Sequence, residues 1–285
     1  LGNLLQSYGE GIRYACGIVA AFILILVLLK LIMFPQMIKE DMKNPIMASV
    51  SGTFPMALML LSTYVKPFIG AAAQYIWYFA IALHIVLIVY FTIKFILKLD
   101  MTKVFASYYI VYVGIAVAAV TAPAYGQLGI GTAAFWFGFV TLIALLILVT
   151  VRYTKYKNVP EPAQPLFCIY AAPTSLCIAG YVQSVTPKSR TFLLVMLAVA
   201  TVIYVIALVK AIGYLKLKFY PSYAAFTFPF VISAIATKQT MACLAKMEQP
   251  LPILKPVVLV ETIIATVLVI YTFIRFMGFL FSSNK

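Results

Sequence analysis

Long apolar stretches recur along the whole chain, and each is long enough to cross a membrane. A helix that spans the hydrocarbon core needs roughly 20 mostly apolar residues. Nine complete stretches of this kind lie at 11–34, 45–66, 70–99, 103–124, 128–153, 164–184, 188–214, 220–240 and 252–281. Only helices and closed barrels satisfy their own backbone in lipid, so stretches of this length predict helices. The connections are short, so residues 1–285 are expected to form a single transmembrane domain.

Charged residues make up only 10% of the chain, although its formal net charge is +14. The basic residues sit at the ends of the apolar stretches instead of forming runs, which argues against a nucleic-acid partner. Counted loop by loop, 14 basic residues fall on one side and seven on the other. The positive-inside rule makes the richer side cytoplasmic. A multi-pass protein with a cytoplasmic C-terminus is therefore expected, and nine spans then place the N-terminus outside.

Three of the stretches carry a proline near their middle, and a fourth carries a glycine at the matching place. These breaks are Pro55, Gly114, Pro173 and Pro229, separated by 59, 59 and 56 residues. A proline inside a helix removes a hydrogen bond and clashes with the preceding turn, at a cost of about 3 kcal/mol. The regular spacing matches a hairpin of two membrane helices and predicts an array of such hairpins.

The stretches with a break are rich in small and hydroxyl residues, whereas their partners are bulkier and uniformly apolar. Irregular backbone is tolerated in a membrane only inside protein or against water. The helices at 45–66, 103–124, 164–184 and 220–240 are therefore expected to face inward and line a central pore. Repeats can also pack into a solid core, in which case each proline is only a tolerated kink. The expected pore-lining hydroxyls are Ser51, Thr53, Thr174, Ser175, Thr227 and Ser233.

The repeat also extends backwards. Subtracting 59 from Pro55 reaches a position just before residue 1, so LGNLLQSYG is interpreted as the tail of a fifth helix with a break. The expected fold is an all-α integral membrane protein of ten transmembrane helices. They form five hairpins around a central pore, with the first helix truncated here and nine complete spans visible. No cleavable signal peptide is recognised at the start, because a basic segment followed by an apolar one is missing.

Three of these stretches together resemble the tellurite-resistance/dicarboxylate transporter family, which includes the slow-type anion channels. They are AAFTFPFVISAIATK at 224–238, YAAPTSLCIAGY at 170–181 and NPIMASVSGTFPMAL at 44–58. The resemblance implies ten helices with the odd-numbered ones around a pore, often assembled as trimers. It also implies that Phe228, the phenylalanine before the break, closes the pore as a gate. By repeat symmetry Phe54 is a second candidate, whereas Val113 and Ala172 precede the other breaks, so no complete aromatic ring is expected.

The residues themselves agree with a route for anions. Helix N-termini created at the breaks carry partial positive charge, and no carboxylate lies in any of the four stretches with a break. Lys66 and Lys238 stand beyond their breaks, where they could form a basic outer mouth that concentrates anions. The alternative is that both lysines only anchor their helices at the interface. Short loops and the lack of long termini favour a bacterial inner-membrane protein.

Two other functions are compatible with the sequence. A proton-coupled carrier for C4-dicarboxylates such as malate, or for tellurite- or sulfite-related anions, would need a protonatable group in the membrane. His84, in the lipid-side helix, and Glu261, near the outer surface, are the candidates. The third hypothesis is a membrane scaffold that transports nothing. No phosphate-binding loop, metal-binding His/Glu motif or cysteine–histidine cluster occurs, so neither an enzyme nor a cofactor is predicted. The anion itself stays open.

Overall fold

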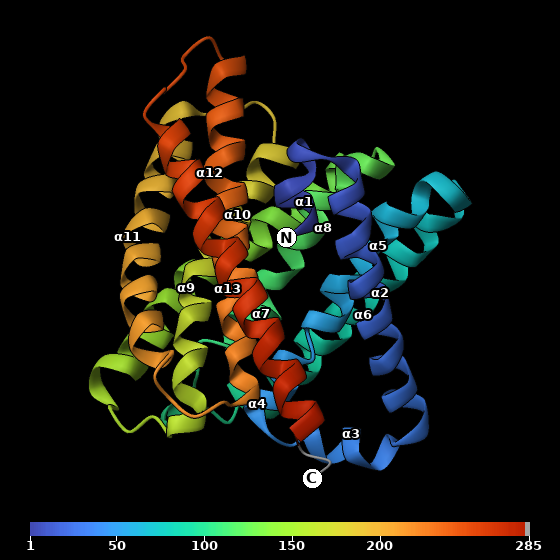
Figure 1. Ribbon diagram of the computed structural model, residues 1–285, viewed down its shortest axis with the longest axis vertical. Helices are drawn as coiled ribbons and strands as arrows, with labels where there is room; N and C mark the ends of the chain where they lie inside the picture. Colours follow the sequence, from blue (N-terminus) through green and yellow to red (C-terminus); the bar gives the residue numbers. More distant parts are fainter. Residues whose placement is uncertain (283–285) are drawn as a thin grey trace.

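The computed structural model describes residues 1–282, and all of its regular secondary structure in that part is helical (Figure 1). Nine helical segments within the described residues are long and apolar enough to cross a membrane. The expected class of all-α integral membrane protein is therefore confirmed. The segments are Glu10–Met33, Pro45–Ile69, Ala72–Ile96, Tyr108–Tyr125, Leu128–Lys155, Glu161–Ser184, Arg190–Tyr214, Pro221–Lys246 and Leu254–Ser282.

Five of these segments are continuous helices. They are α2 (Glu10–Met33), α6 (Ala72–Phe91, extended by a π-turn to Ile96), α9 (Leu128–Lys155), α11 (Arg190–Tyr214) and α13 (Leu254–Ser282). Short helices complete the chain. They are α1 (Gly2–Leu5) with the 3-10 turn η1 (Gln6–Tyr8), α3 (Pro35–Asp41) and the 3-10 turn η3 (Met101–Lys103).

The other four segments are each made of two or more pieces, and we call them the broken helices. The first joins α4 (Pro45–Val50) to α5 (Thr53–Ile69). In the second, a 3-10 turn η4 (Val113–Ile115) separates α7 (Tyr108–Tyr112) from α8 (Ala116–Thr121), and η5 (Ala122–Tyr125) follows. In the last two, a 3-10 helix precedes an α-helix: η6 (Glu161–Ala171) before α10 (Ala172–Ser184), and η7 (Pro221–Phe226) before α12 (Phe228–Lys246).

Each mid-membrane proline lies in the first turn of a new helix and not inside a continuous one. Pro173 is the second residue of α10, Pro229 is the second residue of α12, and Pro55 is the third residue of α5. A first-turn residue has no intrahelical partner for its N–H group, so proline costs little there. The expected kinks are therefore helix starts, and the penalty that the sequence suggested is avoided.

Gly114 breaks its helix for a different reason, which is close packing. A Cβ atom added to Gly114 would lie 2.8 Å from Sδ of Met56 and 3.0 Å from Cε1 of His84. Both neighbours come from other helices, α5 and α6, which press against the turn η4. Only a residue without a side chain fits between them, so the break here is held by tertiary contacts.

The broken helices are the buried ones. In each, between 39% and 83% of the most apolar window is buried, compared with 0% to 33% in the continuous helices. The irregular backbone is thus covered by protein, as the membrane demands. α2 is the least covered of all and packs against α1 and α5.

The N-terminal residues connect two broken helices at one end of the molecule. Tyr64 Oη on α5 donates a hydrogen bond to Asn3 Oδ1 at 2.5 Å, and Lys238 Nζ on α12 donates to the Leu4 carbonyl at 3.2 Å. Figure 1 shows α1 in the gap between α12 and α5. These residues lie where the repeat would place a fifth broken helix, while the tenth transmembrane helix itself stays a prediction.

The packing of α9 on its neighbours generates a test of the fold. A Cβ atom at Gly131 would lie 2.7 Å from Cβ of Ala122, and it would also collide with Ser184. Gly131→Ala should therefore destabilise the protein by about 1–3 kcal/mol, the usual cost of overpacking. Thermal unfolding of the purified protein in detergent measures the change.

Gly129→Ala is the matched control, because it lies on the same helix with nothing within 4 Å of its added Cβ. It should be neutral or slightly stabilising, since alanine is the better helix former. Equal destabilisation by both substitutions would contradict the packing of α9 described above.

Candidate pore

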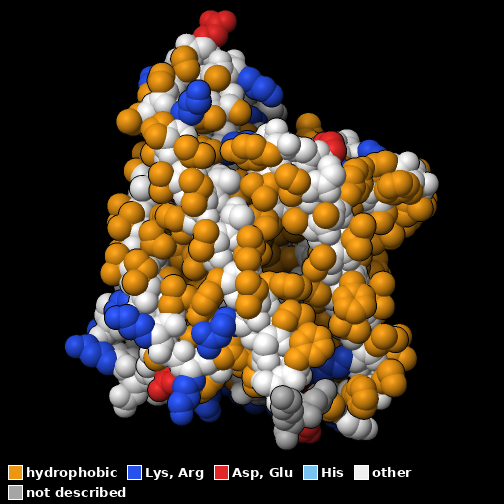
Figure 2. Space-filling model, viewed as in Figure 1, with side chains coloured by type: hydrophobic (Ala, Val, Ile, Leu, Met, Phe, Trp, Pro, Cys, Tyr) orange, Lys and Arg blue, Asp and Glu red, His pale blue; other side chains and the backbone are white. Residues whose placement is uncertain are grey.

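A cavity of about 780 Å³ lies among the four broken helices. Its lining residues come from 44–60, 105–114, 160–176 and 220–229, so every broken helix contributes. These ranges begin in the loops at the end of the molecule that carries α3, which we call the lysine-rich end. By the loop count, 14 of the 21 basic residues belong to this end. Figure 2 shows lysines and arginines at both ends of the molecule, and a hollow near the middle of the view, between the α13 and α5 sides.

The lining is predominantly apolar. Among the described residues around the cavity none carries a charged side chain. The polar side chains in the lining are Asn44, Thr53, Tyr109, Tyr220, Ser222 and Thr227. An ion in such a space has few groups that replace its hydration shell, so the cavity suits transit better than tight binding.

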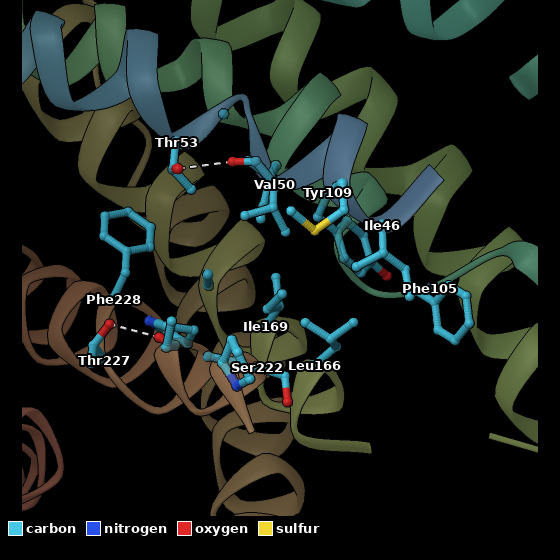
Figure 3. Close-up of a pocket in the computed structure, with 18 of the residues that line it drawn as sticks. Ile46, Val50, Thr53, Phe105, Tyr109, Leu166, Ile169, Ser222, Thr227 and Phe228 are labelled. Atoms are coloured by element: carbon cyan, nitrogen blue, oxygen red, sulfur yellow. Dashed lines mark hydrogen bonds between the residues drawn. The ribbon is translucent and has the colours of Figure 1, made fainter. Parts of the chain in front are cut away.

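Phe228 lies at the inner end of this cavity. Its half-buried side chain projects from the start of α12 and faces Thr53 of α5 across the open space (Figure 3). The last lining residues of the four broken helices, in chain order, are Leu60, Gly114, Leu176 and Pro229. The cavity therefore ends near the level of the breaks. The gate candidate therefore stands where the open space stops.

Phe54 occupies a different position from Phe228. It is half-buried but is absent from the cavity lining, and its neighbour Thr53 lines the cavity instead. The internal repeat thus preserves the position of the break but not the direction of the phenylalanine before it. The geometry gives no support to Phe54 as a second gate.

Of the four breaks, Gly114, Pro173 and Pro229 line the cavity, whereas Pro55 is buried outside it. Residues at three of the four breaks therefore border the open space.

Most of the expected pore hydroxyls point elsewhere. Only Thr53 and Thr227 line the cavity, and each donates its proton to a backbone carbonyl three residues earlier, at 2.8 and 2.7 Å. The remaining four are absent from the lining: Ser51, Thr174, Ser175 and Ser233. Small hydroxyl residues also serve close helix–helix contacts in membranes, and composition does not separate that role from pore lining.

His84 supports the break at Gly114 from behind. Its Nε2 lies 2.9 Å from the carbonyl oxygen of Val111, in the last turn before η4. A carbonyl only accepts, so Nε2 donates and Nδ1 is left without a partner in the described structure. The position of His84 in a lipid-side helix suggested that its side chain faces lipid. The side chain is instead fully buried and points inward from α6. The hydrogen bond is an ordinary interhelical one, and the ring backs the cavity wall at Gly114.

Lys66 and Lys238 both lie at the end opposite the lysine-rich one, and each is held by oxygen acceptors. Lys66 donates to the Ala124 carbonyl and lies 5.4 Å from the centre of the Tyr125 ring. Lys238 donates to Ser7 Oγ at 2.6 Å as well as to the Leu4 carbonyl. Among the described residues neither pairs with an acid, so both charges stay uncompensated.

Arg152, a buried arginine near the cavity, was not identified from the sequence as a functional residue. Arg152 of α9 is 1% exposed, and its guanidinium donates to the carbonyls of Thr102 at 3.2 Å, Asn158 at 3.1 Å and Tyr156. Its Cζ lies 5.5 Å from the centre of the Phe105 ring, which lines the cavity. An arginine that ends an apolar stretch usually reaches the interface, so its position alone does not reveal this burial.

Residues 2–277 match the family model described as voltage-dependent anion channel, SLAC1. The match covers nearly the whole chain and agrees with the resemblance found in the sequence. No curated protein matches the chain.

The contacts of Arg152 generate a prediction. Arg152→Met would leave three loop carbonyls without their donor near the lysine-rich end. Since a hydrogen bond from a charged group contributes about 1.5–3 kcal/mol, we expect a loss of about 3 kcal/mol in stability. Thermal unfolding measures the loss. Lys155→Met, an exposed cation on the same helix, is the control and should be nearly neutral. Equal unfolding temperatures for the two variants would contradict the conclusion that the hydrogen bonds of Arg152 to the loop carbonyls stabilise the protein.

Proposed function

Since the chain belongs to the SLAC1 family of voltage-dependent anion channels, we propose that it is a passive anion channel closed by Phe228. The observation that carries the proposal is the cavity that all four broken helices line and that ends beside Phe228. The family consists of channels and transporters and not of enzymes, in keeping with the absence of a catalytic motif in the sequence.

Closure would come from dehydration. Phe228, Leu60 and Leu176 are apolar and stand at the inner end of the cavity. A hydrophobic constriction blocks ions because it offers no groups to replace their hydration shell. Phe228 is only half-buried and starts α12 directly after the non-helical Thr227, so its ring is less enclosed than a core side chain. Movement of this one ring would widen the constriction.

Preference for anions would come from the surrounding electric field. The helices α5, α10 and α12 all begin at the breaks, and each N-terminus carries the equivalent of about half a positive charge. The buried cation of Arg152 lies behind the cavity wall at Phe105. Lys66 and Lys238 add uncompensated charge at the opposite end. Positive potential without a charged ligand in the cavity suits rapid transit of small anions.

The apolar lining favours a channel over the coupled carrier. A carrier for malate-type dicarboxylates needs cationic groups at its site to compensate two carboxylates. In the described part of the chain no cation lines the cavity. Proton-coupled transport of C4-dicarboxylates, or of tellurite- or sulfite-related anions, is therefore the second candidate. Saturable uptake that collapses with an uncoupler and disappears in His84→Ala would favour it over the channel.

The resemblance also leads us to propose a homotrimer in a bacterial inner membrane, with the lysine-rich end in the cytoplasm. The exposed apolar side chains of the continuous helices fit lipid or neighbouring subunits. The mass of the purified protein by light scattering tests the trimer, and a cysteine-accessibility assay at the loops tests the orientation.

The gate generates the main functional prediction. Phe228→Ala should increase anion conductance by about tenfold or more, because removal of a barrier of about 1.4 kcal/mol multiplies a rate by ten. Planar-bilayer or oocyte recordings with chloride and nitrate measure the change.

Phe54→Ala is the matched control, since it also removes a half-buried phenylalanine before a proline, but one outside the cavity lining. It should leave conductance near the wild-type level. An unchanged current in well-folded Phe228→Ala, or an equal rise in both variants, would rule out the specific gate.

The outer lysines generate a second functional prediction, best tested in the Phe228→Ala background. Lys66→Gln and Lys238→Gln should each lower anion conductance severalfold at low salt. The effect should fade near 1 M salt, where the Debye length falls to about 3 Å. Lys255→Gln, an exposed lysine at the same end on α13, is the control. A loss that persists at high salt would instead point to a structural role for these lysines.

A further inference from the structure

A cluster of polar side chains lies away from the cavity, where α10, α11, α12 and α13 meet on one side of the molecule (Figure 1). Its centre is Glu261 of α13, which is 4% exposed. The polar side chains around it are Tyr204 and Thr201 from α11, Ser175 from α10, and Ser233 and Thr237 from α12. None of these residues lines the main cavity, so the cluster has no part in the proposed route for anions.

Glu261 is buried without a cation. The charged pairs in the described structure lie elsewhere, and Oε2 of Glu261 has no hydrogen-bond partner. Tyr204 is 5% exposed, and its hydroxyl also has no partner. A carboxylate in such a place is costly, whereas a protonated carboxyl is neutral and can donate to a neighbouring hydroxyl.

The cluster has no space for any ligand larger than a proton. The space beside Glu261 is too tight to admit a water molecule, so a hydrated or bare metal ion does not fit. In the described part of the chain no group of three or more histidine, cysteine or acidic side chains could hold a metal. The group that this site can exchange is therefore a proton.

The surroundings leave one carboxyl to titrate. Tyr204 is the ionisable group that α11 presents to Glu261, while α10 and α12 present the hydroxyls of Ser175, Ser233 and Thr237. Lys238 follows Thr237 on α12, but its ammonium group contacts Leu4 and Ser7. On α13 itself the nearest charged residue is the exposed Lys255, almost two turns earlier.

Polar contacts connect the cluster to the breaks. Thr237 Oγ1 donates to the Ser233 carbonyl at 3.2 Å. The Ser233 hydroxyl lies 2.9 Å from the carbonyl oxygen of Pro229 and 3.3 Å from that of Ala171. Ser175 Oγ lies 3.1 Å from Ser233 Oγ. The contacts thus reach the starts of both α12 and α10, and Phe228 is the residue directly before Pro229.

We propose that Glu261 is a proton-binding site that sets the position of α12 and, through it, of Phe228. With the proton bound, the neutral carboxyl lets α10, α12 and α13 stay in contact, and the gate remains closed. Loss of the proton places a negative charge in a dry pocket. The charge draws water between the helices, α12 shifts, and Phe228 leaves the constriction. This inference rests on the proposed channel function and adds its regulation by pH.

Glu261 lies nearer the end opposite the lysine-rich one, and we take this end as the side from which its proton exchanges. It is the eighth residue of α13, and a helix rises about 1.5 Å per residue, so it lies about 10 Å from the start of that helix. Alkaline pH on this side should therefore open the channel, and acidic pH should close it.

The test compares the pH dependence of anion conductance in the wild type, Glu261→Gln and Glu248→Gln. Glutamine keeps the size of the side chain but binds no proton, so Glu261→Gln should stay closed and lose the severalfold rise from acidic to alkaline pH. Glu248 is an exposed acid near the same end and serves as the control. Tyr204→Phe should shift the midpoint of the response without abolishing it.

Phe228→Ala separates this inference from the proposed function. If the channel function holds, Phe228→Ala conducts strongly, and if Glu261 acts through the gate, that current no longer depends on pH. No current in Phe228→Ala would defeat the proposed channel itself. A strong current in Phe228→Ala, together with an unchanged pH profile in Glu261→Gln, would overturn only the role of Glu261.

Infrared spectroscopy tests proton binding without any current. The difference spectrum between acidic and alkaline pH should contain the carbonyl band of a protonated carboxylic acid in the wild type. The band should disappear in Glu261→Gln and persist in Glu248→Gln. A difference spectrum that Glu261→Gln leaves unchanged would overturn the proposal even if conductance depends on pH.

Discussion

The need to satisfy backbone hydrogen bonds inside a membrane controls the rest of this structure. Four spans interrupt their helices in mid-membrane, and each interruption leaves polar backbone that lipid cannot accept. Side chains of the protein form hydrogen bonds with some of these backbone groups. His84 donates to Val111 before the second break, Ser233 contacts the Pro229 and Ala171 carbonyls, and Thr227 donates to Ala224. The continuous helices then keep lipid away from the broken ones.

The same interruptions create the cavity on which the proposed channel function rests. Because α5, α10 and α12 begin at the breaks, helix N-termini gather where the cavity ends, and the cavity itself needs no charged side chain. Cations sit behind the wall or beyond the constriction, as Arg152, Lys66 and Lys238 do. Positive potential without a charged ligand in the cavity, together with the proposed constriction at Phe228, is the arrangement expected of a channel for small anions. Glu261 stands apart as the one buried carboxyl among the described residues.

Patterns along the chain predicted much of this arrangement. Apolar length identified the nine spans, and the spacing of Pro55, Gly114, Pro173 and Pro229 located the breaks. The direction in which each side chain of a broken helix points was harder to predict. Ser175 and Ser233 looked like pore residues, yet they contact each other between α10 and α12. Phe54 and Phe228 precede their prolines identically, yet only Phe228 reaches the cavity. A residue's direction depends on the rotation of its helix, and at a break that rotation changes with each backbone angle between the two pieces.

By itself, the sequence determined the membrane class, the approximate positions of the nine spans, the breaks and the family, because apolar length and proline chemistry are local properties. The tertiary structure alone decided which side of each broken helix faces the cavity. It also decided that His84 points inward, that Arg152 is buried, and that Glu261 meets Tyr204 without a cation. These outcomes depend on contacts between helices far apart in the chain. No local pattern encodes them, because in lipid the packing of small residues against one another, more than polarity, sets how helices rotate and meet.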